Sequence, residues 1–99
     1  MILLLIWGLH GVKDESVLLK LGASLAGVVA SESHRFTGNI DYDFPASRLR
    51  LKGSQEHVTI EVKGAKNLPH EMKERLEKKF REKIKLFVPH VNVTNVLFD

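Results

Sequence analysis

Residues 36–63 read FTGNIDYDFPASRLRLKGSQEHVTIEVK, and this stretch decides the fold because apolar and polar residues alternate through most of it. Alternation with a period of two is typical of strands that have one buried and one solvent-facing side. Turn residues interrupt the alternation at Pro45 and again at Gly53 and Ser54. The sequence therefore predicts three strands, over residues 36–44, 48–52 and 57–63.

In one register of these strands, the residues that face each other across neighbouring strands are chemically matched. If the first turn places Asp43 opposite Arg48, apolar residues of the first two predicted strands face each other and acids face bases. The second and third predicted strands match in the same way when Lys52 lies opposite His57. A slip of one residue would destroy both matches. We therefore predict an antiparallel meander whose solvent-facing charges neutralise one another.

The first part of the chain predicts a buried strand followed by a buried helix. Residues 2–8 are apolar throughout, which is typical of a strand covered on both faces. Asp14 or Ser16 can cap a helix that runs to about Ala30. The surface of this helix is apolar nearly all round, so we expect it to be covered on more than one side.

The last third of the chain predicts an amphipathic helix and a closing strand. Asn67 is the expected N-cap, Pro69 suits the first turn, and Pro89 ends the helix. Apolar residues recur at helical spacing up to Phe87. Residues 91–98 are predicted to form the last strand.

The predicted fold is a single domain over residues 1–99. The element order is β-α-β-β-β-α-β, which gives a mixed sheet with both helices on one face. This is an α/β (α+β) two-layer sandwich of ferredoxin-like type. An alternative merges residues 36–52 into one bent strand and gives β-α-β-β-α-β. No internal repeat is expected from the sequence.

Composition narrows the class of protein. A hydrophobic content of 43% argues against disorder, and a net charge of +3 with a pI of about 9.3 is only mildly basic. The chain has no cysteine, which excludes disulfides and thiolate chemistry. The apolar start is far short of the ~20 residues that cross a bilayer, so we expect a soluble, cytoplasmic protein.

No cofactor or metal is predicted. The five histidines lack the short, regular spacing of metal ligands, and each lies at or beside the end of a predicted element. They are His10, His34, His57, His70 and His90. A site shared by His10 and His34 remains a minor alternative.

The sequence also predicts that the chain is not an enzyme. Ser31, Ser33, His34 and Asp41 offer the groups of a hydrolase triad, but without a nucleophile-elbow motif. Asp41 and Asp43 share a strand face opposite arginines, which would lower the pKa of a carboxyl group meant to act as an acid.

An excess of apolar residues near the start of the chain suggests a protein interface. If the first strand lies in a sheet covered on one side, some of its side chains point to the uncovered side, and a monomer would expose an unusual apolar patch. The predicted interface consists of Ile2, Leu4, Ile6 and Trp7. We therefore predict a non-enzymatic module that self-associates as a homodimer or larger assembly, or docks on a larger protein complex.

The alternative function is binding of RNA or DNA. The second predicted helix carries seven bases against four acids, and its later half is the more basic. Sequence-independent contacts to phosphate would use these cations. The candidate residues are Lys78, Lys79, Arg81, Lys83 and Lys85, together with Arg35.

Overall fold

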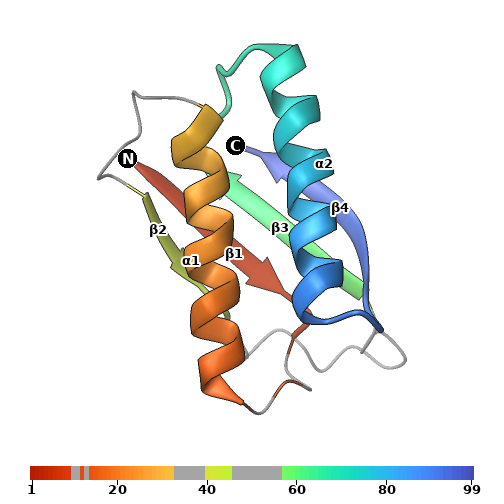
Figure 1. The fold of residues 1–99 in the computed structure, drawn as a ribbon. Coiled ribbons are helices and arrows are strands. Elements are labelled where there is room, and N and C mark those ends of the chain that lie inside the picture. The colour runs from red at the N-terminus through yellow and green to blue at the C-terminus, as the bar shows by residue number, and fades with distance from the viewer. Residues whose placement is uncertain (10–11, 13, 33–39, 46–56) are drawn as a thin grey trace.

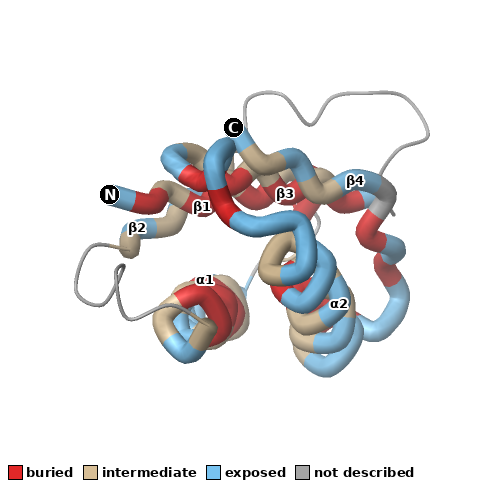
Figure 2. The backbone as a smooth tube through the Cα atoms, turned by 90° about the horizontal axis from the view of Figure 1, so that it is seen from above, coloured by how far each residue is buried: buried red, intermediate tan, exposed pale blue. Residues whose placement is uncertain are grey.

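The computed structural model describes residues 1–9, 12, 14–32, 40–45 and 57–99. The elements are β1 (Ile2–Trp7), α1 (Glu15–Glu32), β2 (Ile40–Asp43), β3 (His57–Lys63), α2 (His70–Phe87) and β4 (Asn92–Phe98). Both helices lie on the same side of a four-stranded sheet (Figures 1 and 2). The prediction of a small α+β fold with a mixed sheet and two helices is thus confirmed.

The order of strands in the sheet is β2-β1-β3-β4. β1 pairs in parallel with β2 and in antiparallel with β3, and β3 pairs in parallel with β4. A ferredoxin-like sheet uses split β-α-β units, in which another strand separates the two strands that a helix joins. Here each helix joins two strands that are direct neighbours, so the ferredoxin-like prediction is wrong in this detail.

The predicted meander is also corrected in part. β2 pairs with β1, and β1 lies between β2 and β3 in the sheet. The physical reason is that β1 is apolar on both sides and occupies a central position, where it receives β2 through the α1 crossover. The predicted strand 48–52, and its pairing with Asp43, lie outside the described residues. The described elements follow the order β-α-β-β-α-β.

The chain folds as two equivalent β-α-β units, a repeat that the sequence analysis did not predict. Each helix has 18 residues, and adding 55 to a residue number in α1 gives its equivalent in α2, so that Glu15 corresponds to His70. Buried helical residues follow this rule in the pairs Leu21 and Leu76, Leu25 and Phe80, and Val29 and Ile84. In the strands the shift is 56, which pairs Ile2 with Val58, Leu4 with Ile60, and Ile6 with Val62.

A glycine with a positive φ follows the first strand of each unit. Gly8 has a φ of +102° and Gly64 a φ of +88°, and their numbers differ by the same 56. A Cβ on Gly8 would lie 2.0 Å from the carbonyl oxygen of His57, and one on Gly64 would lie 2.2 Å from that of Met1. His57 and Met1 are themselves equivalent residues. The two units therefore meet through the same close backbone contact, which a residue with a Cβ would block.

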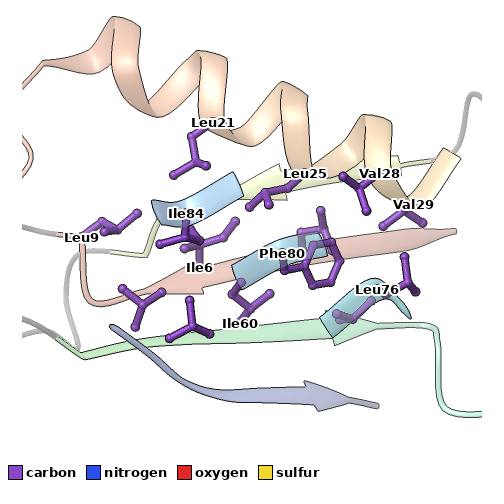
Figure 3. Close-up of a cluster of buried hydrophobic side chains, with 14 of the residues drawn as sticks. Ile6, Leu9, Leu21, Leu25, Val28, Val29, Ile60, Leu76, Phe80 and Ile84 are labelled. Atoms are coloured by element: carbon purple, nitrogen blue, oxygen red, sulfur yellow. The ribbon is translucent and has the colours of Figure 1, made fainter. Parts of the chain in front are cut away.

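The hydrophobic core lies between the sheet and the two helices (Figure 3). Phe80 of α2 is the largest fully buried side chain, and it packs with Leu25 of α1 and Ile60 of β3 in the same cluster. Full burial of one such side chain contributes about 1.5–3 kcal/mol. The buried residues of β1 and β3 thus meet those of both helices on the helix-covered face of the sheet.

One end of each helix follows the predicted local signal. The Asp14 Oδ1 atom accepts hydrogen bonds from the hydroxyl of Ser16 at 2.7 Å and from its backbone N–H at 2.9 Å, which confirms the predicted cap. These bonds hold the pKa of the Asp14 carboxyl below its usual value. α2 ends at Phe87, as Pro89 predicts. Its N-cap is Pro69 with no side-chain cap, so the assignment of Asn67 was wrong.

Polar contacts and a glycine fix α1 in place. Glu32 accepts hydrogen bonds from Lys79 and, at 2.9 Å, from Arg75, which tie the end of α1 to α2 and lower the pKa of the Glu32 carboxyl. At Gly22 the Tyr42 ring of β2 packs against the helix backbone, and an added Cβ would lie 2.1 Å from the ring. This glycine therefore serves close packing between α1 and β2.

Candidate functional site

The candidate site is the open face of the sheet, on the side away from the helices (Figure 2). Burial alternates along β1: the side chains of Ile2, Leu4 and Ile6 have no exposed surface, whereas Leu3, Leu5 and Trp7 are half-buried. Successive side chains of a strand point to opposite faces, so the half-buried set lies on the open face.

The predicted interface residues are therefore placed differently from the expectation. Ile2, Leu4 and Ile6 belong to the core beneath the helices and cannot contact another protein. Both the even-numbered and the odd-numbered residues of β1 are apolar, so the sequence could not show which of the two sets faces away from the helices. Trp7 does lie on the open face, and its part in an interface stays a prediction.

The two central strands contribute unlike side chains to this open face. From β1 come Leu3, Leu5 and Trp7, all apolar or aromatic. Their equivalents on β3 are Thr59, Glu61 and Lys63, and His57 begins the same row. The repeat thus keeps the core alike in both units, while the open face is apolar on β1 and polar on β3. We call these sets the β1 row (Leu3, Leu5, Trp7) and the β3 row (His57, Thr59, Glu61, Lys63).

A chain of polar contacts crosses the open face. The Trp7 Nε1–H donates to Glu61 Oε1 at 2.7 Å, and Lys63 Nζ lies 3.1 Å from Glu61 Oε2. Lys63 Nζ also donates to Asp99 Oδ2 at 2.9 Å. The hydrogen bonds to Asp99 and Glu61 raise the pKa of the Lys63 amine, which is therefore protonated at neutral pH. Glu61, whose side chain is 18% exposed, is held from two sides.

The outer strands add polar groups and one exposed leucine. On β2 the side chains of Asp41 and Asp43 are exposed, and each accepts a hydrogen bond from the backbone N–H of the next residue. Their predicted partners Arg48 and Arg50 lie outside the described residues. On β4 the exposed Leu97 is the partner of Glu61 in the register.

The predicted nucleic-acid surface is not one surface. Lys79 turns toward α1, where it binds Glu32, whereas Arg81 donates to the Val93 carbonyl of β4 and to Glu77. Lys78 and Lys85 are exposed, Lys83 is half-buried, and Arg35 lies outside the described residues. These cations point to different sides of the helix and are partly engaged, so they form no continuous strip for a phosphate backbone.

The remaining candidates do not form a site in the described part of the chain. His70 lies 2.9 Å from Glu74 on the surface of α2, and the proposed pair of His10 and His34 falls outside the described residues. A hollow of about 460 Å³ lies between α1 and α2, lined in part by Lys79 and Lys83. Among the described residues no cluster of three histidine or acidic side chains could hold a metal, and no helix is long and apolar enough to span a membrane.

Comparisons with known proteins identify the fold. No family model matches the sequence, and no curated protein does. Solved structures match this chain, and three of them do so over 98% of its length. A fused 4-oxalocrotonate tautomerase (4-OT) that forms a symmetric trimer has a TM-score of 0.74 and 11% identity, with 83% of its chain covered. A protein called native Ps01740 has a TM-score of 0.70 and 12% identity, with 93% covered. Malonate semialdehyde decarboxylase has a TM-score of 0.67 and 14% identity, with 84% covered.

These matches correct the functional predictions. The prediction of a non-enzymatic interaction module, with nucleic-acid binding as its alternative, is contradicted because neighbours in fold are enzymes. The prediction that the chain is not an enzyme is contradicted for the same reason. The symmetric trimer formed by one neighbour is consistent with self-association, and a nucleic-acid partner has no support. Identities of 11–14% show the fold alone.

Sequence reasoning missed the β3 row as a set. The sequence predicts His57 at the end of a strand and places Glu61 and Lys63 on a neutralised surface. The internal repeat is the sequence signal that identifies the β3 row. Gly8 and Gly64 each follow a predicted strand, which hints at the repeat. Once the repeat is recognised, the contrast between the β1 and β3 rows follows from the printed sequence.

Proposed function

We propose that this chain is an enzyme that acts on a small oxo acid and works as a symmetric assembly of its own copies. The observation that carries the proposal is the fold match over 98% of the chain to 4-OT and to malonate semialdehyde decarboxylase. By their names, one enzyme tautomerises an oxo dicarboxylate and the other decarboxylates an aldehyde acid.

The two named reactions share a chemical need. Tautomerisation removes a proton from a carbon next to a carbonyl group, and decarboxylation of a 3-oxo acid leaves an electron pair on such a carbon. In both cases negative charge develops on the carbonyl oxygen, and hydrogen-bond donors or cations stabilise it. A side chain must also take up or deliver a proton. A protein of this class therefore needs donors and a proton-transferring group on one surface.

The open face supplies groups of these kinds. The β3 row carries an imidazole, a hydroxyl, a carboxylate and a protonated amine on one rigid strand. Trp7 and Glu61 fix each other through the 2.7 Å hydrogen bond. A strand positions its side chains more accurately than a loop does, which suits a catalytic surface.

The β1 row supports the proposed assembly. Leu3, Leu5 and Trp7 lie on the face of the sheet opposite the two described helices. Leu97 of β4, the register partner of Glu61, is 46% exposed on the same face. A second copy placed over this face would remove apolar surface from water. Closed point-group symmetry is the usual form of such assemblies, and the fused 4-OT neighbour is a symmetric trimer.

This chain differs from malonate semialdehyde decarboxylase in the position of its prolines. The structures of malonate semialdehyde decarboxylase include a variant in which the proline at its first position is replaced by alanine. In the present chain Met1 and Ile2 stand at the start of β1, and the three prolines are Pro45, Pro69 and Pro89. The proposal therefore assigns no role to a proline.

Activity is tested on both named reactions. The purified chain is assayed for loss of ultraviolet absorbance from the enol form of 4-oxalocrotonate and for carbon dioxide release from malonate semialdehyde. We expect turnover in at least one assay above the rate of a heat-inactivated sample. Absence of turnover in both assays would reject the proposed function.

Assembly is tested separately by light scattering coupled to size-exclusion chromatography. We expect a mass of several protomers for the unaltered chain and a smaller mass for Leu97→Lys. The matched control is Leu86→Lys, because Leu86 is 71% exposed but lies on α2, in the helix layer. A monomeric unaltered chain, or equal effects of the two variants, would contradict assembly through the open face.

A further inference from the structure

The internal repeat singles out one residue that can exchange protons. Met1 and His57 are equivalent under the shift of 56. Each comes directly before the first buried residue of a central strand, Ile2 in β1 and Val58 in β3. Both are anchored in the same way, since the carbonyl of each fits against a glycine of the other unit. The methionine thioether has no proton to exchange, whereas an imidazole ring has two nitrogens that can accept or donate one.

His57 lies on the open face at one end of the β3 row. The side chain of Val58, the next residue, is fully buried, so the alternation of the strand directs the His57 side chain to the opposite face. His57 is exposed, and its carbonyl oxygen would lie 2.0 Å from any Cβ on Gly8. This close contact fixes the backbone from which the imidazole projects.

Polar residues lie beside this position in the register of the sheet. In the register His57 lies beside Asn92, and Thr59 lies between Trp7 of β1 and Asn95 of β4. Adjacent strands are about 4.8 Å apart, and alternate residues of one strand are about 6.6 Å apart. A small oxo acid of a few carbon atoms is about as long as these spacings.

The opposite end of the β3 row is less suited to proton transfer. The Lys63 amine is occupied by Glu61 and by Asp99, and these contacts raise its pKa, so the amine gives up its proton less readily. Met1, the residue equivalent to His57, offers no acid or base in its side chain. The two ends of the face are thus equivalent in backbone but differ in chemistry.

We propose that His57 is the proton-transferring residue of a site on the open face, with Thr59 and Asn92 as donors to the oxygens of a small oxo acid. This inference rests on the proposed function and names its catalytic residue. The neutral imidazole accepts the proton from the carbon next to the carbonyl group. The electron pair of the broken C–H bond forms a carbon–carbon double bond, and the π pair of the carbonyl group moves to its oxygen to give an enolate. The imidazolium then returns that proton to the oxygen or to another carbon, so that no further reactant is consumed.

The test compares two histidine variants in the tautomerase assay. For His57→Gln we expect kcat to fall by about 10²–10⁴-fold, the usual contribution of general acid–base catalysis, with a KM that changes little. The control is His70→Gln, because His70 is an exposed histidine of α2 that pairs with Glu74. It should keep the kcat of the unaltered enzyme. Circular dichroism and solution mass establish that both variants keep the fold and the assembly.

A second variant tests the chemistry directly. His57→Ala should recover part of its kcat when free imidazole is added, which a purely structural role of His57 would not produce. If the unaltered chain is active and His57→Gln keeps its kcat within about threefold, the assignment of His57 is wrong while the proposed function stands. If the unaltered chain is inactive on both oxo acids, the proposed function and this inference both fail.

Discussion

Replacing the two glycines of α1 by alanine should have opposite effects on stability. At Gly27 no heavy atom lies within 4 Å of the position of an added Cβ. At Gly22 the added Cβ would lie 2.1 Å from Cε1 and 2.2 Å from Cδ1 of Tyr42. Both changes remove a residue that costs about 1 kcal/mol relative to alanine inside a helix. Both variants therefore gain the same stability from the higher helix propensity of alanine, and only Gly22→Ala adds a steric clash.

The size of the clash term follows from the surroundings of Tyr42. Its ring packs edge-on against Phe44 with centroids 6.0 Å apart, and its hydroxyl donates to the Leu19 carbonyl at 3.4 Å. The ring is thus restrained on two sides, and overpacking of this kind costs about 1–3 kcal/mol. We expect Gly27→Ala to stabilise the chain by up to about 1 kcal/mol. Gly22→Ala should be less stable than Gly27→Ala by about 1–3 kcal/mol, since the helix-propensity gain cancels in the difference.

Urea denaturation followed by circular dichroism measures these differences, at one fixed protomer concentration because association alters apparent stability. A third measurement isolates the clash. In a Tyr42→Ala background, Gly22→Ala should become as favourable as Gly27→Ala, because the ring that meets the new methyl group is gone. Equal stabilisation by Gly22→Ala and Gly27→Ala in the presence of Tyr42 would refute the packing of β2 against α1.

Three further outcomes are expected. Gly8→Ala and Gly64→Ala should each lower the free energy of unfolding by about 1–2 kcal/mol because of the left-handed backbone, and by more because of the carbonyl contact. Urea denaturation should give similar losses for the two variants. A change tolerated at only one of the two positions would argue against the repeat. Phe80→Ala should lose about 3–5 kcal/mol because its side chain has no exposed surface, and a loss under about 1 kcal/mol would contradict its place in the core. The pKa of Asp14 is lowered by the Ser16 hydroxyl and backbone, so its stabilising effect is present above the unfolded pKa of 3.8 and is lost as the pH falls through the lower folded value. Asp14→Asn should reduce this acid-side loss in unfolding free energies measured from about pH 6 to pH 2, and an unchanged pH dependence would exclude the cap as its source.

If the chain is the enzyme that we propose, its turnover depends on assembly with further copies of the chain. The open face is polar along β3 and apolar along β1, so a second copy that covers Leu3 and Leu5 would lie beside the row that begins at His57. Exclusion of water from such a junction strengthens hydrogen bonds to a developing enolate. Disruption of the assembly by Leu97→Lys is therefore expected to reduce turnover as well as mass.

Local patterns in the sequence determined several elements of this protein. The alternation from Val58 to Val62 predicted β3 with its observed bounds of residues 57–63. Asp14 and Pro89 predicted one end of each helix, because a cap and a proline act on the backbone groups beside them. The presence of two helices on one face and a mixed sheet followed from the order of these elements.

The tertiary structure alone decided the order of the strands and the identity of the outward-facing residues. Alternation is a property of one segment, whereas the neighbour of a strand depends on how each helix crosses the sheet. In residues 2–7 both parities are apolar, so the sequence could not distinguish the core residues Ile2 and Leu4 from the open-face residues Leu3 and Leu5. Only the packing of α1 and α2 against one side of the sheet makes that choice, because burial beneath the helices, and not hydrophobicity itself, separates the two faces.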